Sequence, residues 1–203
     1  MSLPIAPRRQ QAEERREQIL DAALRVFSQK GFGGASIRDI AREVGITEGL
    51  IYHYFESKEQ LMQACWKERS WHSHVERILA AAEGVPVEQV LKEIVRDFLE
   101  TLREHGPNIR MCMAEMQRNS EMAAEQVERI EATSALIRGF LQARQAAGEL
   151  RPDAEVGMAA GLLLGCAHSL FFIWGTADGE RWDRMTADVV EHGVETVLHG
   201  IAR

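Results

Sequence analysis

Three side chains that can hold a phosphate group lie close together in the segment GITEGLIYHYFESKEQL, residues 45–61. Tyr52 and His53 are adjacent, and Lys58 follows a few positions later. A phenol, an imidazole and an ammonium group can all donate hydrogen bonds to phosphate oxygens, without preference for a particular base. The segment therefore predicts a phosphate-binding surface, with aromatic packing inside a small helical bundle as the alternative.

Capping residues divide this part of the chain into short helices. Ser36 and Asp39 have the spacing of a capping box, which predicts a helix that starts after Ser36 and ends near Gly45. Thr47 is the expected cap of a second helix, which ends at about Phe55. Two short helices joined by a glycine turn predict a helix-turn-helix.

The second of these helices has an inner and an outer side. Ile51 and Phe55 are four residues apart and are expected to face inward. Gly49 has no side chain, so the backbone there could come near DNA. The outer side carries the side chains that a major groove would meet, namely Thr47, Glu48, Leu50, Tyr52 and His53.

The stretch ILDAALRVFSQKGFGGASIRDIAREVGITEGLIYHYFESKEQL, with its flank from about residue 16, resembles the TetR family of transcriptional regulators. The glycine turn, the capping threonine, Gly49, Tyr52 and the SKEQL ending all have the spacing of that family. The resemblance implies an all-α fold, with an N-terminal three-helix helix-turn-helix head and a larger C-terminal helical domain for ligand binding and dimerisation. It implies phosphate or groove contacts for Ser36, Thr47, Tyr52, His53 and Lys58.

Arg38 and Glu48 are candidates for base recognition. Arginine suits the two acceptors of guanine, and the alternatives for Arg38 are a solvated side chain or a partner for Asp39. Glu48 departs from the family pattern, in which many members carry a basic or neutral residue; Val44 also departs, since alanine is frequent there. The Glu48 carboxylate repels phosphate, so we expect it to accept from a cytosine amino group.

The charge is unevenly distributed along the chain. The net charge is −7, yet residues 1–60 hold nine Lys or Arg and nine Asp or Glu, against fifteen and twenty-two in the remainder. A neutral head can still bind phosphate if its cations share a face. The acid content of the whole chain disfavours a non-specific architectural DNA-binding protein.

The rest of the chain also has helical periodicity. We assign residues 1–56, ordered from about residue 13, to the DNA-binding domain and residues 57–203 to the effector-binding and dimerisation domain. The first helix of the second domain is the expected connector between the two. About nine helices are predicted, including 13–30, 57–78, 87–104, 108–117, 121–147, 153–175 and 181–201.

A lone helix-turn-helix reads only a few base pairs, so a dimer is expected to bind a symmetric site. The last two predicted helices have small and apolar stripes that suit a four-helix bundle across a two-fold axis, with an internal core as the alternative. The candidate interface comprises Gly157, Gly161, Leu164, Gly165, His168, Phe171, Trp182, Met185, Val189, Val197 and Ile201.

Methionine and aromatic residues are frequent between the head and the last two helices, and both suit an apolar small-molecule site. The family resemblance implies such a cavity, although plain core or surface is the competing interpretation for each residue. The candidates are Trp66, Trp71, Phe98, Leu102, Arg110, Met111, Met113, Met116, Gln117, Phe140, Leu141, His168 and Trp174, with His72 as a further polar anchor.

Patterns typical of enzymes and metal sites do not occur in the sequence. The seven histidines are scattered, and there is no C-x-x-C, H-E-x-x-H or G-x-S-x-G motif. We therefore expect no enzyme activity, no cofactor and no metal. Three widely spaced cysteines indicate a reducing cytoplasm, and Cys112 near Arg110 leaves a redox-sensing regulator open as an alternative.

The sequence predicts neither a signal peptide nor a membrane helix, because the apolar stretch 156–174 falls just short of a comfortable span. Together these patterns predict a cytoplasmic, ligand-responsive regulator. In its simplest form it is a repressor that binds a palindromic operator as a homodimer and is released by a small apolar or amphipathic effector.

Overall fold

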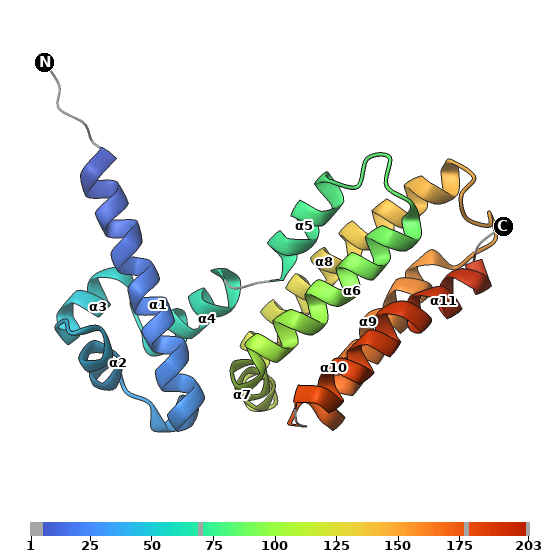
Figure 1. Cartoon of the computed structure of the whole chain (residues 1–203). Helices are drawn as coiled ribbons and strands as arrows, with labels where there is room; N and C mark the ends of the chain where they lie inside the picture. The colour runs from blue at the N-terminus through green and yellow to red at the C-terminus, as the bar shows by residue number, and fades with distance from the viewer. Residues whose placement is uncertain (1–5, 69–70, 177–178, 202–203) are drawn as a thin grey trace, which may run out of the picture. The chain divides into compact units, whose positions relative to one another are not determined.

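A computed structural model describes residues 6–68, 71–176 and 179–201 of the chain, without the side chains of residues 6–9, 68, 200 and 201 (Figure 1). Within these ranges every regular element is a helix, which confirms the predicted all-α fold. The chain forms two compact units, residues 1–70 with 107–122 and residues 71–106 with 123–203. This division differs from the boundary expected at residues 56 and 57, and each unit is described by itself.

The first unit contains the predicted helix-turn-helix head. Its helices are α1 (Ala6–Gly34), α2 (Ile37–Val44), α3 (Glu48–Tyr54), α4 (Lys58–Glu68) and α7 (Gly106–Met116), followed by the start of α8 (Ser120–Ala146). Helix α1 packs against α2 and α4, and α2 packs against α3 (Figure 1). The core includes the fully buried side chains of Ile19, Leu20, Phe27, Ile40, Ile51, Leu61 and Met62.

The predicted caps are present at the turn and hold the two short helices in place. The Ser36 hydroxyl accepts from the Asp39 backbone N–H at 3.1 Å, and the Ser36 N–H donates to the Asp39 carboxylate at 3.1 Å. Gly45 ends α2 in the left-handed conformation, with φ at 76°. The Thr47 hydroxyl accepts from the Leu50 N–H at 3.3 Å, so both helices start at the predicted residues.

The second unit is built around α6 (Val87–Glu104). It also contains α5 (His72–Ala80), most of α8, α9 (Val156–Trp174), α10 (Gly179–Asp188), a π-helical turn η1 (Val189–Gly193) and α11 (Val194–Ile201). Helix α6 contacts α5, α9, η1 and α11 (Figure 1). The buried side chains of α6 recur every three or four residues, as burial of one face of a helix requires: Val90, Leu91, Ile94, Val95, Phe98, Leu99 and Leu102.

The described residues of the long helix predicted over 57–78 are divided between two elements. The structure has α4 and α5 instead, residues 69–70 lie outside the described part, and Trp71 occupies a turn. The Trp71 indole N–H donates to the Asp97 carboxylate at 2.6 Å, and His74 Nδ1 lies 3.1 Å from the same oxygen. Asp97 on α6 therefore fixes the first turn of α5. These contacts lie between residues more than twenty positions apart, which sequence periodicity does not report.

The last predicted helix, 181–201, contains the π-helical turn η1. A π turn has one more residue than an α turn, so it shifts the residues after it by one position. As a result Val190, Val194 and Leu198 are buried, while Val189 and Val197 are half-buried. Glu191 in this turn accepts from Lys92 of α6 at 2.6 Å, and this bond is the main cause that raises the Lys92 pKa to about 12.

Candidate DNA-contacting surface and effector-binding residues

Helix α3 separates an apolar inner side from a polar outer side. Ile51 and Phe55 are 0% and 3% exposed, which confirms that they face inward. Tyr52 is 52% exposed, and His53 is exposed beside it. Thr47, Glu48 and Gly49 are exposed as well, and Leu50 is half-buried. A side chain built at Gly49 would meet no atom within 4 Å, so the backbone of α3 is open to a large partner there.

Asp39 organises the start of α2. Its carboxylate accepts from Lys30 at 2.7 Å and from the Ser36 hydroxyl at 2.7 Å. These two hydrogen bonds, with Lys30 the larger contributor, lower the pKa of Asp39 to about 2. The Ser36 hydroxyl thus already has two partners within the head, and its predicted phosphate contact stays a prediction.

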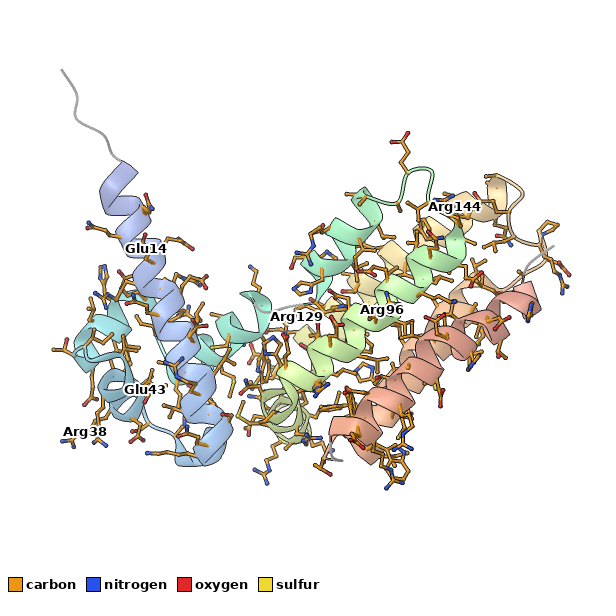
Figure 2. The ribbon with its side chains drawn as sticks, viewed as in Figure 1. Glu14, Arg38, Glu43, Arg96, Arg129 and Arg144 are labelled. Atoms are coloured by element: carbon orange, nitrogen blue, oxygen red, sulfur yellow. The ribbon has the colours of Figure 1, made fainter. Side chains whose placement is uncertain are left out.

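Arg38 extends away from the head into solvent (Figure 2). Among the ion pairs of the described residues, Asp39 pairs with Lys30 and, at 3.9 Å, with Arg42. Arg38 is therefore not the partner of Asp39, which was one of the alternatives for it. Its exposed guanidinium group is compatible both with base recognition and with simple solvation.

Lys58 has a different environment from the one expected at a phosphate contact. Its ammonium group donates to the backbone carbonyls of Phe32 at 2.8 Å and Ala35 at 3.1 Å. It also lies 4.3 Å from the centre of the Phe32 ring, and the side chain is partly buried. The partners are backbone atoms 23 and 26 positions earlier, so no side-chain motif could have identified them.

In the second unit, three predicted effector residues form an aromatic–histidine cluster of Trp71, Phe98 and His168. The ring centres of Trp71 and Phe98 lie 4.4 Å apart, and those of Phe98 and His168 lie 4.7 Å apart with edge-to-face geometry. Burial lowers the pKa of His168 below its ordinary value of 6.5, despite a hydrogen bond from its ring to the Leu164 carbonyl. Neutral His168 therefore sits in an aromatic environment inside the unit.

Thr133 is a buried polar residue beside His72 that sequence reasoning missed. Its side chain is 7% exposed, and its hydroxyl donates to the Arg129 carbonyl at 2.9 Å. His72 Nδ1 lies 3.0 Å from the same hydroxyl oxygen. With its proton directed at the Arg129 carbonyl, the Thr133 hydroxyl oxygen can accept from His72 when the imidazole carries its proton on Nδ1. A threonine within a helix has no pattern that would have marked it.

The other effector candidates have varied environments. In the second unit Leu102 and Leu141 are buried, Phe140 lies 5.0 Å from the Arg144 guanidinium, and Trp174 lies 4.0 Å from that of Arg181. In the first unit Trp66 and Met111 pack against the core of the head, and the indole N–H of Trp66 is buried with no acceptor among the described residues. The remaining candidates there are Arg110, Met113 and Met116, which are half-buried, and Gln117, which is exposed.

An open pocket of about 420 Å³ lies elsewhere in the second unit. None of the predicted effector residues lines it. Its lining residues are Pro86, Val87, Glu88, Glu149, Leu150, Glu195, Leu198 and His199.

Helix α9 has an apolar face that the described residues leave uncovered. It is long and apolar enough to cross a membrane by length and composition, and 33% of that window is buried within the chain. The predicted small residues Gly157, Gly161 and Gly165 are on the exposed side. Around them lie exposed large side chains: Met158 at 65%, Leu162 at 59%, Phe172 at 48% and Ile173 at 65%.

Two residues predicted for the dimer interface are used inside the protomer instead. Phe171 is 1% exposed and Trp182 is 6% exposed, so both belong to the core of the second unit. The other candidates Leu164, His168, Met185, Val189 and Val197 are half-buried, and the side chain of Ile201 lies outside the described residues. Sequence reasoning chose Leu164, His168 and Phe171 as the large residues beside the glycines, whereas the exposed large residues are the four named above.

The fold and the exposed α3 surface define a class of protein: a DNA-binding transcriptional regulator with a helix-turn-helix head and a C-terminal helical domain. Residues 19–65 match the model described as bacterial regulatory proteins, tetR family, and residues 89–200 match the AefR-like transcriptional repressor C-terminal domain. The chain belongs to the TetR family of transcriptional regulators. Regulators of this family bind operator DNA and small-molecule effectors and act as dimers.

Individual relatives extend this likeness over most of the chain. The HTH-type transcriptional regulator UidR of Escherichia coli K12 is 28% identical over 192 residues, 94% of both chains. The HTH-type transcriptional repressor NicS of Pseudomonas putida is 30% identical over 161 residues, 76% of this chain and 68% of NicS. The structure is similar to FadR of Bacillus subtilis in complex with stearoyl-CoA, with a TM-score of 0.75, 21% identity and coverage of 91% and 98%.

Proposed function

We propose that this chain is a cytoplasmic, ligand-responsive repressor. It binds a palindromic operator as a homodimer and leaves the operator when a small apolar or amphipathic effector binds. The observation that carries this proposal is the outer side of α3, where Tyr52 and His53 stand exposed on a helix anchored by the Thr47 cap and the buried Phe55. The repressor names of NicS and of the C-terminal family model support repression.

The proposed DNA contacts follow from the chemistry of each exposed group. Tyr52 and His53 donate to phosphate oxygens, and the open backbone at Gly49 lets α3 come close to the groove. Arg38 reads guanine, and Glu48 accepts from a cytosine amino group. In a two-fold dimer the two α3 helices enter successive major grooves roughly 34–36 Å apart, which requires a palindromic site.

The uncovered side of α9 is the proposed dimer interface. Four large apolar side chains and the exposed Gly157, Gly161 and Gly165 lie along one side of α9. Glycines let a second helix approach closely, and the apolar side chains would be covered by the partner. Met185, Val189 and Val197 are half-buried on the final helical segments and complete the proposed four-helix bundle.

The effector is proposed to bind beside the aromatic–histidine cluster. Trp71 and Phe98 supply flat apolar contacts, and neutral His168 supplies a polar group at low cost in desolvation. The stearoyl-CoA in the complex of the similar FadR makes an acyl thioester a reasonable first probe.

A redox-sensing regulator was the alternative. Cys112 is 9% exposed, and burial of this kind restricts access by oxidants. We therefore keep the ligand-responsive proposal, and an operator-binding assay with and without mild oxidant separates the two.

The proposal is tested by fluorescence anisotropy with a labelled duplex from the DNA that flanks the chain's own gene. We expect half-saturation in the nanomolar range, a strong preference over a random duplex, and release by one member of a panel of stearoyl-CoA, stearate and small aromatic acids. A binding ratio near one between the two duplexes would overturn specific binding. Unchanged affinity with every effector that binds the protein would overturn induction.

A further inference from the structure

The ammonium group of Lys58 is already engaged within the head. Lys58 is the first residue of α4, and its Nζ donates to the Phe32 and Ala35 carbonyls at 2.8 and 3.1 Å. An ammonium group has three N–H donors, so these two bonds use most of its capacity. The Phe32 ring, 4.3 Å away, covers the same cation. Lys58 therefore contacts residues 32–35 in three places, namely two backbone carbonyls and one aromatic ring.

That turn joins α1 to α2. Gly31 has φ at 69° and ψ at 163°, which breaks the helical geometry near the end of α1. Carbonyls at such a break lack partners within the helix and need another donor. Ala35 directly precedes Ser36, the cap of α2, and its side chain is 4% exposed. Lys58 thus holds the backbone that leads into α2.

The other end of the lysine is equally well fixed. The Gln60 N–H donates to the Ser57 hydroxyl at 3.0 Å, so α4 has a side-chain cap directly before Lys58. Phe55, at the end of α3, is buried in the same core. Lys58 consequently connects the segment that follows α3 to the segment that precedes α2, and these are the two helices that carry the proposed DNA contacts.

We propose that Lys58 is a positioning residue for DNA binding, which acts by fixing the start of α2 relative to α3 and does not bind a phosphate itself. This inference rests on the proposed DNA binding. It assigns to Lys58 a role opposite to the direct phosphate contact expected from the sequence. The two roles differ in a measurable way. Log affinity falls with log salt concentration, and each phosphate contact makes this slope steeper by roughly 0.9 on duplex DNA.

The first experiment compares the salt dependence of Lys58→Met with that of the wild type. The probe is the labelled duplex that the wild-type chain selects from a random library. We expect Lys58→Met to bind roughly tenfold more weakly at every salt concentration with an unchanged slope. Lys67→Met, the same charge change at an exposed residue of α4, is the matched control and should leave both quantities unchanged. Lys58→Arg, which retains a cation with several donors, should restore part of the affinity.

A slope shallower by roughly 1.8 in Lys58→Met, which is about 0.9 for each protomer of the proposed dimer, with normal thermal stability, would overturn the proposal in favour of a phosphate contact. A second measurement uses the wild-type chain and so does not depend on a folded variant. We expect the Lys58 ammonium signal in a proton–nitrogen spectrum to be protected from solvent exchange without DNA, unlike that of exposed Lys67. Protection that appears only after the duplex is added would also overturn the proposal. If the wild type selects no duplex, the proposed function is overturned. The contacts of Lys58 are still tested, because its ammonium signal is measured without DNA.

Discussion

The outer side of α3 and the uncovered side of α9 are both exposed, yet they differ in chemistry. On α3 the exposed groups are a phenol, an imidazole, a carboxylate and a bare stretch of backbone at Gly49. On α9 they are four large apolar side chains beside glycines. Exposed polar groups are stable in water because they hydrogen-bond to it. Exposed apolar surface is unfavourable in water, and covering it lowers the free energy of the system.

The two surfaces also differ in how they are held. Helix α3 has only seven residues and depends on the Thr47 cap and the burial of Ile51. Helix α9 has nineteen residues and is anchored by a continuous buried side that includes Leu163, Ala167 and Phe171. The comparison indicates that local hydrogen bonds position the DNA-contacting surface, while packing positions the surface proposed for dimerisation. The predictions below test that contrast.

The largest effect is expected at α9. Leu162→Arg places a charge in each half of the proposed interface, and an unpaired buried charge costs about 3 kcal/mol or more. We expect monomers in sedimentation equilibrium and at least about a 100-fold loss of affinity for the selected duplex. Val127→Arg, at an exposed apolar residue of α8, is the matched control and should remain dimeric. A dimer that persists in Leu162→Arg would contradict the proposed interface.

A smaller effect is expected at α3. Tyr52→Phe removes one proposed hydrogen bond to phosphate from each protomer of the dimer, worth about 1 kcal/mol each, so affinity should fall roughly thirtyfold with unchanged thermal stability. Tyr54→Phe makes the same chemical change at the neighbouring tyrosine, which packs partly against the core of the head. Equal effects of the two changes on affinity in anisotropy titrations would contradict the assignment of Tyr52 to the DNA surface.

The cap of α2 should matter for stability. Ser36→Ala removes the hydroxyl that accepts from Asp39, and loss of such a cap costs about 1 kcal/mol. We expect a lower midpoint in urea unfolding with the same dependence on urea concentration. Ser120→Ala, at the exposed first residue of α8, serves as the comparison and should change the midpoint less. An unchanged midpoint in Ser36→Ala would mean that packing alone holds α2.

The smallest effects concern pH. The folded-state pKa of Asp39 is lowered to about 2, so its stabilising contribution is complete above about pH 4 and is lost as the pH falls toward 2. The pKa of His168 is also lowered, so the unfolded chain takes up a proton first and stability falls as the pH drops below 6.5. Urea unfolding from pH 7 to 5.5 should show this loss, and His168→Phe should reduce it. A pH dependence that is identical in the variant would contradict a buried, neutral His168.

The sequence was most informative where structure depends on near neighbours. The capping box of Ser36 and Asp39 and the inward side of α3 follow from spacings of three and four residues, and the structure has both. The partners of Lys58 and the turn at Trp71 were not predictable, because the first are backbone atoms and the second depends on Asp97 of another helix. For Phe171 and Trp182, periodicity predicted an apolar side of each helix, but it could not show that the core of the second unit covers them.

The π-helical turn Val189–Gly193 has a consequence for the end of the chain. Each added residue advances a helix by about 100° around its axis, so the residues of α11 point in a direction that an uninterrupted helix would not give them. Deletion of one residue in this turn would restore ordinary winding and rotate Val194 and Leu198 out of the core. The presence of one residue in this turn therefore decides which side of α11 is buried in the second unit and which side faces solvent.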